Sequence, residues 1–237
     1  MPRTARVAPK EHVYHVMTRG NNRQAVFRDD EDYGRYLAIL QRYRKKYTFK
    51  LYHYVLMRNH VHLVLQPAEQ GGALSEIMKG INLSYAYHYK KKYRHVGHFW
   101  QDRYKSIIVS ADEYLLACGS YVELNPVRAH IVDDPMDYRW SSYAWYACGH
   151  SNQLLDTQPV YQAFGRNAGE RRQKYRDFVM AMLREKKALR GEMDRKLAYG
   201  SDDFIGRLAK KHPIAAALRP QGRPKKVDCV DKQNRPL

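Results

Sequence analysis

Apolar and polar residues alternate along residues 51–66, on both sides of a break at Met57-Arg58-Asn59. Alternation with a period of two is the pattern of a β-strand with one buried face, and a short polar break between two such runs is typical of a tight turn. The segment therefore predicts two strands joined by a turn. Residues 12–18 alternate in the same way and predict an earlier strand, and residues 103–109 predict a later one.

Two longer segments repeat their apolar residues at intervals of three and four, which is the period of an amphipathic helix. The first, residues 29–47, has acidic residues in its first turn and basic residues near its end, as the helix dipole favours. The second, residues 73–93, follows the break at Gly71-Gly72. Both segments are predicted to be helices.

A third helix is predicted after Ser110. Ser110 and Glu113 have the spacing of a capping box, in which the serine caps the helix and the glutamate reaches back to the cap. The helix must stop near Asn125, because Pro126 disfavours helical geometry in the residue before it. Tyr121 and Asn125 are four residues apart, so they lie on one face of this helix, one turn from each other.

The rest of the chain is more helical and more basic. Residues 136–149 are aromatic and are expected to pack on the first core, residues 151–200 look largely helical, and a short helix capped by Ser201 is predicted over 201–211. The last stretch is poor in apolar residues and is expected to be disordered. The chain thus divides into a basic arm at 1–11, a strand-and-helix domain at 12–147, a mainly helical extension at 148–218 and a basic tail at 219–237.

Two histidines provide the first candidate chemistry. His60 and His62 are two residues apart on a predicted strand, so both imidazoles leave the same face. Two imidazoles fixed on a rigid strand can hold a divalent metal ion with little ordering cost. In a chain with 11 histidines, such a pair can also be an ordinary half-buried polar face. The metal site is favoured only if a third ligand and a nucleophile accompany the two histidines. Asn125 and Tyr121, one turn apart on the predicted helix, are the candidates for these two roles.

The segment Arg19-Gly20-Asn21-Asn22-Arg23 predicts a turn, because glycine and asparagine favour turn conformations. Exposed backbone N–H groups in a turn flanked by two arginines can bind a phosphate. A plain connecting loop fits the same residues on local grounds.

The charge of the chain indicates its partner. Its 42 Lys and Arg residues against 24 Asp and Glu give a net charge of +18 and a pI near 9.8. A field of this sign needs a polyanion, and nucleic acid is the obvious one. Many of the 20 tyrosines alternate with basic residues, which suits stacking on unpaired bases, although core positions would also explain them. The tail around Arg223 and Lys225 could lie in an A·T-rich minor groove, or it could be a solvated tail.

Other classes of protein find less support. A membrane surface would also attract this charge, but the chain has neither a long basic amphipathic helix with a clean apolar face nor an apolar run that approaches a membrane span. Cys118, Cys148 and Cys229 have no CxxC spacing, so neither a zinc site nor a disulfide framework is supported. The N-terminus has no apolar leader segment, and a cytoplasmic protein is therefore the default.

Four motifs follow one another along the chain: the 19–23 turn, His60-Val61-His62, the segment 100–106 and the segment 121–129. In this order and spacing they resemble the single-tyrosine HUH transposases, the IS200-like class. More narrowly, they are similar to the REP-associated tyrosine transposases, which act on repeated extragenic palindromes in bacteria. The likeness is specific over about residues 10–145, and it is looser at residues 140–143 and in the Gly-Arg-Pro-Lys-Lys tail.

The resemblance implies a ferredoxin-like or RRM-like α+β domain with an antiparallel sheet and helices on one face, and the predicted order of elements is compatible with it. It also implies that His60, His62 and Asn125 bind Mg²⁺ or Mn²⁺, and that Tyr121 cleaves single-stranded DNA through a 5′-phosphotyrosine. The implied partner is single-stranded or hairpin DNA with REP-like palindromes. The candidate DNA contacts are Arg19, Asn21, Asn22, Arg23, Arg103, Lys105, Arg128, Arg223 and Lys225.

Three alternatives stay open on the sequence. A mobile-element transposase of the same class would work as an obligate dimer, so a monomer and a homodimer both remain. A domesticated, non-catalytic protein would bind hairpins without cleaving them, but a silent site has no physical need for His60, His62, Tyr121 and Asn125 together. An RRM-like RNA-binding module would carry aromatic residues on its central strands, where this chain has histidines.

Overall fold

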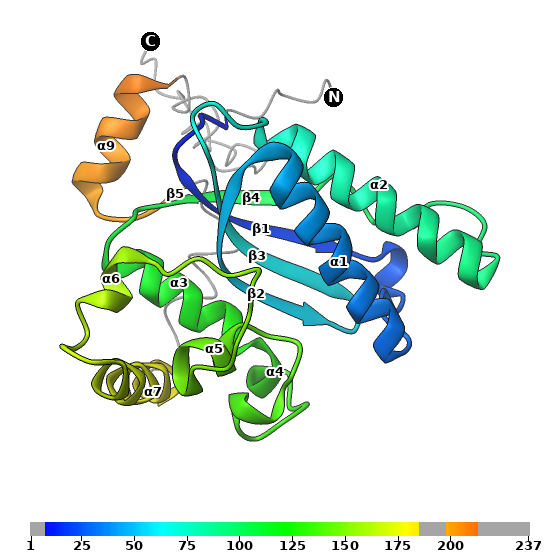
Figure 1. Ribbon diagram of the computed structural model, residues 1–237. Helices are drawn as coiled ribbons and strands as arrows, with labels where there is room; N and C mark the ends of the chain where they lie inside the picture. Colours follow the sequence, from blue (N-terminus) through cyan, green and yellow to red (C-terminus); the bar gives the residue numbers. More distant parts are fainter. Residues whose placement is uncertain (1–7, 185–197, 213–237) are drawn as a thin grey trace, which may run out of the picture.

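One five-stranded sheet organises the fold (Figure 1). The computed structural model describes residues 8–184 and 198–212. The strands lie in the order β2-β3-β1-β4-β5, and all neighbours are antiparallel except β4 and β5, which are parallel. The strands are β1 (Val13–Arg19), β2 (Phe49–Met57), β3 (His60–Pro67), β4 (Lys105–Val109) and β5 (Ala198–Tyr199).

The β2–β3 hairpin turns at Arg58-Asn59, within the predicted break. Strand β3 lies between β2 and β1, and its residues from Val61 to Leu65 are all buried. Because both faces of the sheet are covered there, the middle of the strand carries apolar residues on both sides. The predicted pair of strands is therefore confirmed, and so are the predicted strands that became β1 and β4.

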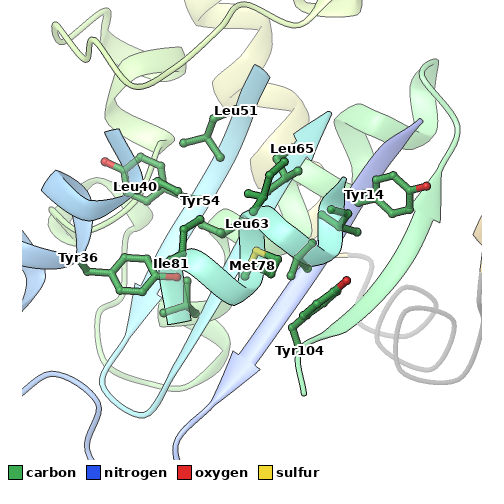
Figure 2. Packing of buried hydrophobic residues seen from close by; sticks show 14 of the residues in the cluster. Tyr14, Tyr36, Leu40, Leu51, Tyr54, Leu63, Leu65, Met78, Ile81 and Tyr104 are labelled. Carbon is green, nitrogen blue, oxygen red and sulfur yellow. The ribbon is translucent and has the colours of Figure 1, made fainter. Parts of the chain in front are cut away.

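Helices α1 (Asp30–Tyr47) and α2 (Leu74–Tyr93) cover one face of the sheet. The Asp29 side chain caps α1 by accepting a hydrogen bond from the Asp32 backbone at 3.0 Å, as its predicted start requires. Both predicted helices are confirmed. Figure 2 shows how their buried residues meet the sheet, among them Tyr36, Leu40, Met78 and Ile81 from the helices and Tyr14, Tyr54, Leu63 and Leu65 from the strands.

Helix α3 (Glu113–Glu123) lies on the opposite face of the sheet, where Leu115, Cys118 and Val122 form a second core with the strands. The predicted α+β class is confirmed. The expected position of the helices on one face of the sheet holds only for α1 and α2. Two layers of helices sandwich the sheet, and each layer has its own core.

The predicted capping box at Ser110 is wrong. The backbone N–H of Ser110 still donates to Tyr199 of β5, so the chain is extended there, and the helix begins three residues later. Asp112 is the actual cap: its carboxylate accepts from the Tyr114 backbone at 3.1 Å, and Ser110 Oγ donates to the same carboxylate at 2.7 Å. The predicted stop before Pro126 is confirmed, because α3 ends at Glu123.

The chain after α3 packs beneath that helix. Tyr143, Tyr146, Tyr161 and Tyr175 form a third core with Leu116 and Leu124. The mainly helical extension is confirmed over its described part, and Ser201 caps the last helix by accepting from the Phe204 backbone at 3.2 Å. Strand β5 was not predicted. The helices are α4 (Asn125–Arg128), α5 (Tyr143–Cys148), α6 (Pro159–Gln162), α7 (Ala168–Arg184) and α9 (Asp202–Lys211).

The proposed division at residue 147 stays a prediction, since residues on both sides of it share the third core. The basic arm at 1–11 lies mostly, and the tail at 219–237 entirely, outside the described residues. Within the part of the chain that the structure describes, no helix has the length and apolar character needed to cross a membrane.

Candidate functional site

The histidine pair of β3 faces helix α3. Antiparallel strands place directly opposed residues on the same side of a sheet. His60 lies opposite Arg19, and His62 lies opposite Met17, whose other neighbour across the sheet is Lys105. The two imidazole centroids are 5.0 Å apart at an interplanar angle of 80°. The strand register therefore gathers both histidines and two cationic residues on one face.

The turn before β3 fixes the tautomer of His60. Nδ1 of His60 lies 2.6 Å from Oδ1 of Asn59. An amide oxygen only accepts hydrogen bonds, so Nδ1 carries the proton and the lone pair of the ring is on Nε2. This leaves Nε2 as the nitrogen of His60 that can bind a metal ion.

A third histidine, His15 of β1, was not predicted. It is two residues from Met17 on the same strand, and so points to the same face as His62. Nε2 of His15 lies 2.8 Å from Nδ1 of His62, and the two rings stack with centroids 5.0 Å apart at 13°. The alternation of β1 could have shown which face His15 is on, but only the pairing of β1 with β3 brings it to His62.

The environment keeps these imidazoles neutral. Burial lowers the pKa of His15 to about 4. Burial, followed by the nearby charge of Arg19, lowers the pKa of His60 to about 4. The pKa of His62 falls well below its usual 6.5 through burial first, then through His15, His60 and Arg19. Neutral imidazoles with a lone pair are the form that binds metal ions.

Tyr121 belongs to helix α3 and approaches the histidines of the sheet from that helix. It is 6% exposed, and its ring meets the rings of His15 and His62 edge-on, at centroid distances of 6.0 and 6.3 Å. The Arg128 guanidinium lies 5.1 Å from the centroid of the same ring and donates to the Tyr121 carbonyl at 3.2 Å. A phenol, two strand histidines and a cation thus converge at the interface between the sheet and α3.

Asn125 lies just beyond α3, and not on the last turn of that helix where its spacing from Tyr121 had placed it. It is the first residue of α4, and its amide nitrogen donates to the carbonyls of Tyr121 at 2.9 Å and Val122 at 3.1 Å. The side chain is thereby held at the end of α3, beside Tyr121. With the nitrogen bound to the helix, Oδ1 is the atom of this amide that could bind a metal ion.

Across residues 8–184 and 198–212, no group of three or more His, Cys, Asp and Glu side chains is arranged to hold a metal ion. His15 cannot extend the pair to three, because its Nε2 is bonded to His62 and its Nδ1 is buried. A cation at His60 and His62 would therefore need oxygen ligands of another kind, such as the Asn125 amide or a phosphate.

A buried carboxylate two residues after Tyr121 holds α3 in place, and it too was not predicted. Oε1 of Glu123 accepts from Ser142 Oγ at 2.5 Å and lies 2.9 Å from Nδ1 of His53. Oε2 accepts from the Tyr175 hydroxyl at 2.6 Å. Glu123 is 0% exposed. Its partners come from β2, from the start of α5 and from α7, so three elements fix the end of the helix that carries Tyr121.

Three backbone N–H groups of the 19–23 turn, which was predicted to offer open N–H groups, already have partners. The N–H groups of Gly20 and Asn21 donate to the Asn59 and Phe99 carbonyls of neighbouring loops, and that of Arg23 donates to the Gly20 carbonyl within the turn. The side chains of Asn21, Asn22 and Arg23 are exposed, so they are available for a phosphate contact.

The other candidate DNA contacts are spread around the site. Arg19 and Lys105 leave the sheet on the face of the histidines, and Arg103 is exposed just before β4. Nε of Arg19 is buried and has no hydrogen-bond partner among the described residues. Arg223 and Lys225 lie outside the described residues.

Comparisons with known proteins give a family match and a similar fold. Residues 9–125 match the family model described as Transposase IS200 like. The fold is similar to that of a REP-associated tyrosine transposase solved with a REP hairpin, with a TM-score of 0.55, 15% identity and coverage of 70% of this chain and 98% of that chain. A putative transposase from Deinococcus radiodurans R1 has 19% identity, a TM-score of 0.36 and coverage of 55% of this chain and 92% of its own. A comparison with curated proteins found no match.

The matched segment contains four strands of the sheet, all three helices that sandwich it, and the residues His60, His62, Tyr121 and Asn125. The resemblance seen in the sequence is confirmed at this level. Through residues 9–125, the chain belongs to the IS200-like transposase family.

Proposed function

We propose that this protein cleaves and rejoins single-stranded DNA at REP-like palindromic hairpins, with Tyr121 as the nucleophile and a divalent cation held by His60 and His62. The observation that carries the proposal is the position of Tyr121. Its ring lies 6.3 Å from that of His62, although the two residues come from opposite sides of the interface between α3 and the sheet. Membership of a transposase family supports the same reading.

The donor set suits Mn²⁺ or Mg²⁺. Both histidines are neutral near pH 7, since their pKa values are lowered by burial, and Nε2 of His60 carries a lone pair. Oδ1 of Asn125 and phosphate oxygens would complete the ligands. Mixed nitrogen and oxygen ligands suit Mn²⁺ readily, whereas Mg²⁺ prefers oxygen and would bind less tightly. When bound, such a cation would polarise the scissile phosphate and offset the charge on its non-bridging oxygens.

The reaction that fits these residues is a phosphoryl transfer to a phenol. Tyr121 loses its proton and its oxygen attacks phosphorus, while the bond from phosphorus to the 3′ oxygen breaks and that oxygen takes up a proton. The products are a 5′-phosphotyrosine and a free 3′-hydroxyl. The 3′-hydroxyl of another cleaved end can reverse the step and join strands without ATP. The Arg128 cation, 5.1 Å from the ring centroid, favours the negative charge that develops on the phenol.

Hairpin DNA suits the charges around the site. Arg19 and Lys105 project from the sheet beside the histidines, and Arg103 extends the positive charge along the surface. Contacts with phosphates would make the affinity fall steeply as the salt concentration rises. The similar solved structure holds a REP hairpin, which favours palindromic hairpins as the substrate of this chain. An enzyme acting on chromosomal palindromes would work in the cytoplasm.

The direct test is formation of a covalent protein–DNA adduct. Full-length protein is incubated with labelled hairpin oligonucleotides and Mn²⁺ or Mg²⁺, and adducts that survive denaturant are counted on a gel. We expect wild-type protein to form the adduct and Tyr121→Phe to form none. The matched control is Tyr87→Phe, which removes the hydroxyl of a tyrosine that is 72% exposed on α2, across the sheet from the site. A normal yield from Tyr121→Phe would overturn the proposal.

The histidines have a separate expected effect. His60→Ala should abolish the adduct, because His60 would hold the cation that cleavage needs. Hairpin binding, measured by fluorescence anisotropy, should stay largely intact, because His60 serves the chemistry and not the affinity for DNA. Wild-type protein that binds hairpins tightly but forms no adduct with either metal would instead identify a non-catalytic DNA-binding protein.

A further inference from the structure

We propose that His15 is a positioning residue for His62: it accepts the proton of His62 Nδ1 and thereby leaves the lone pair of His62 on Nε2, where a divalent cation can bind. This inference rests on the proposed function, because it assigns a role toward the cation that function requires. The residue lies outside every motif that pointed to the site.

The contact is built for a specific hydrogen bond. The two nitrogens are 2.8 Å apart, and the rings stack nearly parallel at 13°. His15 is 4% exposed and His62 is 3% exposed, so water does not compete for this bond. The pairing of β1 with β3, in which His15 lies opposite Val64 and His62 opposite Met17, fixes both backbones and leaves little freedom for either ring to turn away.

The direction of this hydrogen bond decides whether His62 can be a ligand. A neutral imidazole has one N–H group and one lone pair. If Nδ1 of His62 donates to His15, the lone pair of His62 is on Nε2 and can bind a cation. If Nε2 of His15 donates instead, Nε2 of His62 carries a proton and cannot bind one. A metal-binding histidine generally needs such a partner on its other nitrogen.

A buried nitrogen of His15 makes one direction of this hydrogen bond more stable than the other when no cation is bound. Nδ1 of His15 is buried and has no hydrogen-bond partner among the described residues. In the state that can bind metal, this atom carries a proton with no acceptor, which is unfavourable. In the other state it holds only a lone pair, and an unpaired acceptor is tolerated more easily than an unpaired donor. The cation-free protein should therefore favour the state that cannot bind metal, and cation binding should reverse the hydrogen bond.

His15 is not itself a third ligand. Nε2 of His15 points to Nδ1 of His62, on the edge of that ring away from Nε2, where the cation would sit. His60 has a different arrangement for the same task, since its Nδ1 is held by Asn59. Each of the two candidate ligands thus has its own partner that sets its tautomer.

The test measures Mn²⁺ affinity by the electron paramagnetic resonance signal of free Mn²⁺, with and without hairpin oligonucleotide. Full-length Tyr121→Phe protein serves as the parent, so that no cleavage intervenes. His15→Leu removes the acceptor and should weaken Mn²⁺ binding about tenfold or more, the usual effect of losing such a partner. His15→Gln keeps an acceptor at a similar reach and should recover most of the affinity. His62→Ala should show the largest loss.

Two results would overturn the inference. One is a His15→Leu protein that binds Mn²⁺ as tightly as the parent while His62→Ala has lost affinity. The other is a parent that binds no Mn²⁺ in either condition, which would also remove the cation from the proposed function. The adduct assay on wild-type protein distinguishes a failure of this inference from a failure of the proposed function. If wild-type protein forms Tyr121-dependent adducts while His15→Leu binds Mn²⁺ as tightly as the parent, the proposed function holds and His15 does not have this role.

A spectroscopic measurement reads the hydrogen bond itself. Protein labelled with ¹⁵N-histidine is followed by long-range ¹H–¹⁵N correlation as Mg²⁺ is added. We expect Nδ1 of His62 to become the protonated nitrogen and Nε2 of His15 the unprotonated one. Bound Mg²⁺ with Nδ1 of His62 still unprotonated would contradict the inference. Circular dichroism of His15→Leu and His15→Gln checks that both variants are folded, so that a loss of affinity can be distinguished from a loss of structure.

Discussion

At the scale of single residues, the candidate site depends on where a few protons lie. Asn59 holds the proton of His60 on Nδ1, and His15 meets Nδ1 of His62 at 2.8 Å. His60 therefore has Nε2 as the nitrogen for a cation, whereas His62 has it only when His15 accepts the proton of Nδ1. Burial keeps the rings neutral, which is the form that can bind a metal ion. For the same reason, protonation of these rings in acid destabilises the folded protein.

The buried histidines should make the protein less stable in mild acid. The pKa of His15 is about 4 in the folded protein and 6.5 when unfolded, so the unfolded chain binds more protons between these values. The free energy of unfolding therefore falls as the pH drops from 6.5 toward 4, by at most about 1.4 kcal/mol per pH unit for one histidine. Urea unfolding at pH 7 and pH 5 should show this loss.

Replacing the titrating ring is the control for that measurement. His15→Gln cannot take up a proton in this range, so its stability should fall less between pH 7 and pH 5 than that of the wild type. His60 and His62 still contribute in the variant, since their pKa values shift in the same direction. Equal losses in the two proteins would show that His15 is not buried in the neutral form.

At the scale of elements, the position of α3 decides whether Tyr121 meets the histidines. The helix is held near Tyr121 by the buried Glu123 carboxylate, and one of the donors to it, Tyr175, belongs to α7. The extension thus contributes to the placement of Tyr121 from outside the segment that matches the family model.

Tyr175→Phe should slow adduct formation. It removes one hydrogen bond to a buried carboxylate, which should lower the free energy of unfolding by about 1–3 kcal/mol and loosen the end of α3. The matched control is Tyr161→Phe, which removes a hydrogen bond of 2.8 Å in the same core; this bond is to the Tyr146 carbonyl of α5 and does not join Tyr161 to α3. At saturating hairpin DNA, the rate should fall for Tyr175→Phe and change little for Tyr161→Phe. Equal rates would show that α7 does not position α3.

Close packing of α3 on β2 gives a second prediction. A Cβ at Gly119 would lie 2.4 Å from Nε2 of His53, so Gly119→Ala should push the helix off the strand and destabilise the protein by about 1–3 kcal/mol. Gly34→Ala in α1 meets nothing within 4 Å and should instead stabilise by about 0.5–1 kcal/mol through helix propensity. Thermal unfolding of the two variants checks both signs. A neutral or stabilising Gly119→Ala would contradict the observed packing.

At the scale of the whole molecule, the two faces of the sheet have different roles. Helices α1 and α2 bury one face in an apolar core, while the other face carries His60, His62 and the neighbouring cations up to the edge of α3. The net charge of +18 would supply the long-range attraction to DNA that the proposed function needs, and the register of the strands places the candidate residues beside one another.

Periodicity predicted what is local in this fold. The spacing of His60 and His62, the hairpin that carries them and the helix of Tyr121 all follow from patterns within one segment. The contact of His15 with His62 was missed because strand pairing is not written in either strand alone. The Glu123 network was missed for a similar reason, since Tyr175 is 52 residues away in the chain. The cap at Ser110 was misplaced because β5 keeps that residue extended.

The central claim is that Tyr121 is the residue that becomes linked to DNA, and mapping the link tests it most directly. The adduct formed by wild-type protein on a hairpin oligonucleotide is digested with nuclease and protease, and the modified peptide is sequenced by mass spectrometry. We expect the nucleotide remnant on Tyr121 through its phosphate. The chain has 20 tyrosines, so a remnant on any other one would contradict this account of the site.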